Sequence, residues 1–304
     1  MHYAPYPLVT DDAALGLVHT TVQNPLGSAV ARHRPTRTST RATIFLHGAA
    51  GSWTTWTPLL AAAAAQGIEL HNPVLIDMPG WGDARLTDDP TDQTIATVCE
   101  LVKDVAETLG YTEWDIVGHS MGGFIALHMA SIWPQCVLSI GLVSPTTWSV
   151  IESVEHPVRR FGTLPAFTAL WRVMRGLAAL PAAGTGVVRF ARRTRLLRTA
   201  VFPLFRHPFR VDRPIIDALA TEVRPRSFAA AAEITRGYDA DAMWASIACP
   251  VFALKGDGDV FVTPGDFARL SRALPDATIT VIADCGHFAA IERPIECLEA
   301  LGIR

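Results

Sequence analysis

The chain of 304 residues is 49% apolar and carries a formal net charge of −3 at pH 7. It is long enough to bury a large core and long for one minimal domain. A charge so close to zero gives no general attraction to nucleic acid or to an anionic membrane, so we expect neither as a partner. The composition leaves the oligomeric state open.

The cysteines and the N-terminal residues bear on the compartment. The N-terminus has Pro and Asp residues where a signal peptide would need a basic and then an apolar segment. The longest uncharged stretch of the arginine-rich middle segment, residues 176–188, is too short to span a bilayer. The five cysteines are widely spaced and form no CxxC pair or Cys/His cluster: Cys99, Cys136, Cys249, Cys285 and Cys297. We therefore expect a cytoplasmic protein with no membrane span, no metal and no cofactor.

Short apolar runs rich in β-branched residues alternate with helical patterns. This alternation predicts an α/β fold, with a mostly parallel central sheet flanked by helices. A leading antiparallel pair is expected within residues 15–34, turning near residues 24–28. Apolar residues at steps of three and four predict a helix from Ile95 to Leu109, closed by Gly110. The strands are expected at residues 43–46, 74–77, 114–117, 138–144, 251–254 and 278–282.

The alternation stops at residue 145. From there to residue 245 the sequence consists of helical segments broken by prolines. This segment holds 15 arginines, no lysine and 8 acidic residues, which gives a net charge of +7 against −10 for the remainder. We therefore predict a helical cap at residues 145–245, inserted in a core domain formed by residues 1–144 and 246–304.

A GxSxG pentad, Gly118-His119-Ser120-Met121-Gly122, lies between the strand expected at residues 114–117 and a helical stretch. This context predicts a sharp strand-to-helix turn that exposes the Ser120 hydroxyl above the sheet. A serine hydroxyl is a poor nucleophile at neutral pH, so it needs a base and a third group that fixes the tautomer of the base.

His287 is the best-placed base, because it follows the last expected strand, at the edge where the serine turn should lie. The alternative is a structural histidine at a strand end. Two carboxylates follow the strand at 251–254, and we choose Asp259 as the acid. Asp257 is kept as the second choice, because carboxylates on a Gly-rich turn also serve as turn formers. The order serine, acid, histidine is that of strand-turn-helix GxSxG enzymes.

An oxyanion needs two fixed donors. One is expected from the amide of Met121, at a helix N-terminus that favours negative charge. The other is expected from the amide of Ala49, in the loop that follows the strand at 43–46. The alternative there is a glycine turn that only closes the strand. An apolar acyl pocket is expected from Trp53, Trp148 and Phe288, and packing of the cap on the core is the alternative for each.

The chain resembles capped members of the α/β-hydrolase superfamily. This resemblance implies Ser120, Asp259 and His287 as the triad, the amides of Ala49 and Met121 as the oxyanion hole, and a cap between the strands ending near 144 and starting near 250. The matching elements, in order, are Leu46-His47-Gly48, Asp77 to Gly82, the GHSMGG nucleophile elbow from Gly118 to Gly123, Gly256 to Asp259, and Gly286-His287-Phe288 with Glu292-Arg293-Pro294.

The expected activity is a cofactor-independent serine hydrolase that cleaves an ester, lactone or thioester of a moderately apolar acid through an acyl-serine intermediate. Relatives that dehalogenate or open epoxides use an aspartate where this chain has Ser120. Ala49, Ala50 and Phe288 depart from the pattern of the carbon-carbon bond hydrolases of this superfamily. They weaken the assignment of the chain to that subgroup, but the assignment stays open. A lyase or cyclase with the same triad stays open too, as does a receptor-like ligand-binding protein.

Overall fold

The computed structural model describes residues 2–88, 93–194 and 196–303. Its eight strands form one sheet in the order β1-β2-β4-β3-β5-β6-β7-β8. β1 pairs with β2, and β2 with β4, in antiparallel register, whereas all other pairs are parallel. The mostly parallel sheet and the leading antiparallel pair are thus confirmed. The strands are β1 (Val18–Asn24), β2 (Gly27–His33), β3 (Arg41–Leu46), β4 (Pro73–Asp77), β5 (Glu113–His119), β6 (Val137–Val143), β7 (Val251–Gly256) and β8 (Thr278–Ile282).

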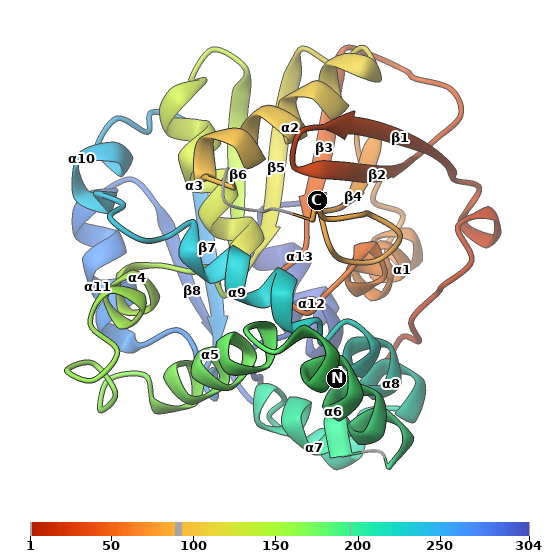
Figure 1. Ribbon diagram of the computed structural model, residues 1–304. Helices are drawn as coiled ribbons and strands as arrows, with labels where there is room; N and C mark the ends of the chain where they lie inside the picture. The colour runs from red at the N-terminus through yellow and green to blue at the C-terminus, as the bar shows by residue number, and fades with distance from the viewer. Residues whose placement is uncertain (1, 89–92, 195, 304) are drawn as a thin grey trace.

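Helices cover both faces of the sheet (Figure 1). Because side chains alternate along a strand, Ile44 of β3 packs in one core with α2 and α3, while Phe45 packs in the other with α1 and α13. The helix predicted from Ile95 is confirmed as α2, and Gly110 follows it with a φ of +80°. These helices are α1 (Thr57–Ala65), α2 (Ile95–Thr108), α3 (Met121–Ile132), α11 (Pro264–Ala273), α12 (Ala289–Glu292) and α13 (Pro294–Ala300).

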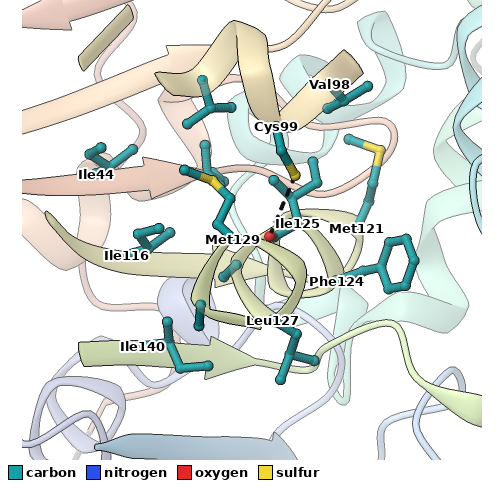
Figure 2. Close-up of a cluster of buried hydrophobic side chains, with 14 of the residues drawn as sticks. Ile44, Val98, Cys99, Ile116, Met121, Phe124, Ile125, Leu127, Met129 and Ile140 are labelled. Carbon is teal, nitrogen blue, oxygen red and sulfur yellow. Dashed lines mark hydrogen bonds between the residues drawn. The ribbon is translucent and has the colours of Figure 1, made fainter. Parts of the chain in front are cut away.

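Helix α3 is apolar on every side because it lies between the sheet and other helices. Its residues Met121 to Ala130 are all buried, and the Cys99 thiol of α2 donates to the Ile125 carbonyl at 3.9 Å. Figure 2 shows this helix packed between α2 and side chains of three neighbouring strands, Ile44, Ile116 and Ile140. This packing fixes the N-terminus of α3, where Ser120 lies.

Between β6 and β7 the described chain is helical, and Figure 1 shows α5 to α8 beyond the carboxyl ends of the parallel strands. Helices α5, α8 and α9 each begin with a proline in the first turn, where its missing N–H costs no helical hydrogen bond. Phe167 and Trp171 of α5 share an apolar cluster with Phe228 of α9. The division into core and cap domains stays a prediction. The helices are α4 (Trp148–Glu155), α5 (Pro165–Ala178), α6 (Pro181–Arg193), α7 (Leu196–Val201), α8 (Arg213–Thr221), α9 (Pro225–Glu233) and α10 (Ala240–Trp244).

Candidate active site

Ser120 sits between β5 and α3 with φ of 52° and ψ of −114°, a conformation that is strained for a residue with a side chain. The turn is possible because glycines surround it. A Cβ added to Gly118 would lie 2.2 Å from the carbonyl oxygen of Gly122, and one added to Gly122 would lie 2.1 Å from the carbonyl oxygen of Leu46. The Ser120 amide donates to the carbonyl of Val143 in β6 at 3.0 Å, which fixes the turn over the sheet edge.

Asp259 lies on the loop after β7 and His287 on the loop after β8, and their side chains are in contact. The Nδ1 atom of His287 lies 3.0 Å from Oδ1 and 3.1 Å from Oδ2 of Asp259. The side chains of His287 and Asp259 are only 4% and 0% exposed. Because Nδ1 faces the carboxylate, Nε2 is the ring nitrogen that can take a proton from a hydroxyl.

The charge on Asp259 is supported from several sides. Burial works against ionisation, but the nearby His287 ring, its hydrogen bond and the Ser144 hydroxyl together hold the pKa of Asp259 below its usual value. The amides of Phe261 and Val262 also donate to Oδ1, at 2.8 and 3.2 Å. Asp257, the second choice, has a side chain that is 40% exposed and accepts from the Cys285 amide at 3.2 Å. The structure therefore brings His287 together with Asp259 and not with Asp257.

The two expected oxyanion donors border the same cavity as Ser120 and His287. In the part of the chain that the structure describes, the amides of Ala49 and Met121 have no hydrogen-bond acceptor within the protein. The loop that carries Ala49 passes close to the serine, since a Cβ added to Gly48 would lie 2.8 Å from Cβ of Ser120. Both residues thus border the cavity with an amide that has no acceptor among the described residues, and their role as the oxyanion hole stays a prediction.

His47 holds this loop in place. Its Nδ1 donates to the Gly48 carbonyl at 2.8 Å, and its Nε2 accepts from the Met78 amide at 3.0 Å. Complete burial lowers the pKa of His47, so the ring stays neutral and can keep one donor and one acceptor. His47 therefore acts on the loop after β3 as a fixed hydrogen-bonding support.

His119, which has no role in the sequence-based prediction, lies against the proposed base. Its ring centroid is 4.7 Å from that of His287, and its Nε2 donates to the His287 carbonyl at 3.0 Å. Burial, followed by the proximity of His287, lowers the pKa of His119 to about 3. A pKa this far below the working pH makes His119 a weak base, so it is a poor alternative to His287 as the general base. Cys285 is equally unsuited as a nucleophile, because burial raises the pKa of its thiol.

The cavity has a volume of about 60 Å³, and its wall is mainly apolar. Phe288, expected in the pocket, lines it, whereas Trp53 and Trp148 do not. Trp53 packs in the core that Phe45 shares with α1 and α13, with the Arg32 guanidinium 4.9 Å from its ring centroid. Trp148 packs edge-to-face on Trp244 at 4.7 Å. The wall comes instead from the helices between β6 and β7 and from the loop after β7: Val150, Phe167, Leu170, Phe228, Ala231, Ala232 and Phe261.

Two further properties of the described residues concern metal ions and membrane-spanning helices. Within residues 2–88, 93–194 and 196–303, no group of three or more His, Cys, Asp or Glu side chains is arranged to hold a metal ion. Among those same residues, no helix is both long enough and apolar enough to cross a membrane.

Comparison with known proteins places the chain in a family. A sequence model described as "Alpha/beta hydrolase family" matches residues 43–300. The chain is 35% identical over 104 residues to a dihydrolipoyllysine-residue acetyltransferase component of an acetoin cleaving system from Cupriavidus necator. That match covers 34% of the chain and only 26% of the relative.

Two relatives match over most of their length. A 2-hydroxy-6-oxononadienedioate/2-hydroxy-6-oxononatrienedioate hydrolase from Klebsiella pneumoniae is 24% identical over 82% of the chain and 81% of the relative. A pimeloyl-[acyl-carrier protein] methyl ester esterase from Aromatoleum aromaticum is 26% identical over 81% of the chain and 89% of the relative. Among solved structures, a thermophilic esterase from Thermogutta terrifontis superposes with a TM-score of 0.67 at 18% identity, over 94% of this chain and 96% of that one. This likeness concerns the fold.

Proposed function

The chain belongs to the alpha/beta hydrolase family, and we propose that it is a serine hydrolase that cleaves an ester, lactone or thioester of a moderately apolar acid. One observation carries the proposal. Ser120, His287 and the two amides without an acceptor all border one cavity whose wall is mainly apolar. A nucleophile, a base and an oxyanion site thus face one space, as acyl transfer requires.

The reaction would proceed in two halves. His287 Nε2 takes the proton from Ser120 as the hydroxyl oxygen attacks the acyl carbon, and the carboxylate of Asp259 stabilises the imidazolium that forms. The amides of Ala49 and Met121 donate to the oxyanion. His287 then gives its proton to the leaving group, which departs from the acyl-serine. In the second half His287 activates a water molecule that releases the acid and restores the serine.

The wall of the cavity favours an uncharged acyl group. No Lys or Arg is among the described residues that line it, and its polar side chains outside the proposed triad are the neutral Ser144, Thr146 and Thr235. An acyl group with a second carboxylate would lose its hydration there without gaining a cationic partner. The substrate in the name of the Klebsiella pneumoniae relative is a dicarboxylate, so this lining favours ester cleavage over that carbon-carbon hydrolysis. The similarity to a methyl ester esterase supports the same choice.

Turnover in ¹⁸O-labelled water tests the proposal, with a series of p-nitrophenyl esters from acetate to octanoate as substrates. We expect the label in the released acid, and no turnover by a folded Ser120→Ala variant. A product that forms without label would indicate a lyase or cyclase instead. Near-single turnover across the whole series would favour a receptor-like protein.

A further inference from the structure

The carboxylate of Glu292, at the end of α12, is a fully buried acceptor for four donors. Its Oε2 accepts from the Tyr3 hydroxyl at 2.6 Å and from the amides of Arg206 and Gly286 at 3.0 and 2.8 Å. Its Oε1 accepts from the amide of Phe288 at 3.0 Å. Four donors, and no acceptor among the residues that the structure describes, suit the ionised form of this carboxyl group, since a protonated carboxyl would have to donate.

Two of these donors flank the proposed base. Gly286 and Phe288 are the immediate neighbours of His287, and each binds a different oxygen of Glu292. The amide of His287 itself donates to the carbonyl of Leu204 at 2.7 Å. Three consecutive amides are therefore held, and the backbone that carries the imidazole is fixed from two sides.

The other donors come from the N-terminal segment and from the segment between α7 and α8. Arg206 of that segment shares Oε2 with Gly286, and the amide of His207 donates to the Tyr3 hydroxyl at 2.9 Å. Phe205 stacks on Phe288 with ring centroids 5.2 Å apart and an interplanar angle of 24°. Leu204, which precedes Phe205 in the same segment, also lines the cavity. One carboxylate thus joins the loop of the base to a wall of the acyl site.

The protonation of the two partners in the 2.6 Å contact bears on this role. Burial raises the pKa of Glu292 above its usual value, and the hydrogen bonds from Tyr3 and from the amides of Arg206, Gly286 and Phe288 offset part of that rise. Burial and the neighbouring Glu292 charge raise the pKa of Tyr3, so its hydroxyl keeps its proton and remains a donor.

We propose that Glu292 is a positioning residue, whose carboxylate holds His287 in line with Ser120 and couples that histidine to residues 204–206 of the cavity wall. The inference rests on the proposed function for the role of His287 as the base. It predicts that loosening this carboxylate slows the chemical step and loosens two segments that are far apart in the sequence.

The test compares Glu292→Gln with the wild-type protein. Glutamine preserves the volume but offers one acceptor oxygen, and its NH₂ group would face a donor. We expect kcat/KM for p-nitrophenyl esters to fall by up to about 100-fold, mainly through kcat, because small displacements of a reacting group cost that much. Hydrogen exchange should become faster in residues 285–288 and in residues 204–207 together, while exchange in the other described residues stays as in the wild type.

Glu222→Gln is the matched control. Glu222, which follows α8, also accepts a backbone amide across the fold, from Gly82 at 2.9 Å, and it pairs with Arg224 at the same distance. Neither Gly82 nor Arg224 belongs to residues 204–207 or 285–288. We expect this variant to leave kcat/KM and exchange at residues 285–288 as in the wild type. If Glu292→Gln does not fold, Tyr3→Phe removes one donor and keeps the carboxylate, and it should show the same paired exchange with a smaller loss of kcat.

The outcomes separate this inference from the proposed function. A wild-type protein that no fluorophosphonate labels would contradict the proposed function, whatever Glu292 does. A wild type that is labelled, together with a folded Glu292→Gln variant of wild-type kcat, would overturn the inference alone. So would a loss of kcat without faster exchange in the two segments, because the carboxylate would then act otherwise than by positioning.

Discussion

The imidazole of His287 faces the carboxylate of Asp259 with Nδ1 3.0 Å from Oδ1, and both side chains are buried. This contact sets the tautomer, because the carboxylate accepts a hydrogen bond from Nδ1–H and so leaves the lone pair of Nε2 free to take a proton from Ser120. The same contact would stabilise the imidazolium that forms during attack. The contact therefore gives Asp259 a specific role that a substitution can test.

Replacing Asp259 by Asn should lower kcat by roughly a thousandfold or more, because the amide favours the wrong tautomer of His287. Asp257→Asn is the matched control, since Asp257 lies in the same turn but bonds the Cys285 amide instead. It should keep most of the wild-type activity. Steady-state kinetics on one short ester compares the two variants. The reverse ranking would move the acid to Asp257.

Gly122→Ala should break the nucleophile turn. The added methyl group would lie 2.1 Å from the Leu46 carbonyl oxygen, so the backbone of one of the two residues must shift. We expect a loss of about 1–3 kcal/mol in the free energy of unfolding, typical of overpacking, together with a loss of turnover. Gly176→Ala in α5 is the control, because no atom lies within 4 Å of its added Cβ. It should be neutral or slightly stabilising in urea unfolding. Equal stabilities would mean that the turn tolerates the methyl group.

The acyl cavity should be narrowed by Ala232→Leu. Ala232 of α9 lines the cavity, whose volume is about 60 Å³, so a larger side chain takes space from the acyl chain. We expect the ratio of kcat/KM for p-nitrophenyl butyrate to that for the acetate to fall by about tenfold. Ala229 of the same helix borders a different hollow, next to Arg226 and Glu233, and Ala229→Leu should keep the wild-type ratio. An unchanged ratio in Ala232→Leu would place the acyl group elsewhere.

The neutral His119 predicts a loss of stability in acid. Burial and the nearby His287 lower the pKa of His119 to about 3, whereas the unfolded chain takes up this proton near pH ~6.5. Between those values the unfolded state binds the extra proton, so stability falls as the pH falls. His119→Gln cannot titrate, and its stability should decline less, with a difference on the order of a few kcal/mol at about pH 4. Urea unfolding across this acidic range measures both slopes. Parallel slopes would contradict the neutral buried ring.

Periodicity and turn chemistry made most of the fold predictable. Each of the six strands expected from a β-branched run overlaps one of the strands β3 to β8. The GxSxG pentad marked the junction of β5 and α3. Aromatic residues were less informative. Trp53 and Trp148 are both buried, but burial alone does not tell which side of a helix or loop faces a cavity, and both pack against other elements.

Contacts between distant segments could not be predicted. Tyr3 meets Glu292 across 289 residues of sequence, and no local pattern marks that pairing. The Glu292-Arg293-Pro294 element was visible as part of the family resemblance, but its buried carboxylate and four donors emerge only in the folded chain. Similarly, His119 gains its contact with His287 because the end of β5 and the loop after β8 meet at one edge of the sheet.

The most direct test of the account is labelling with a fluorophosphonate probe followed by mass mapping of the modified peptide. We expect one adduct, on Ser120, in the wild type and in Ser144→Ala, which alters the other serine of the cavity wall. No adduct should form in a folded Ser120→Ala variant. Labelling that persists in Ser120→Ala, or that maps to another residue in the wild type, would contradict Ser120 as the nucleophile.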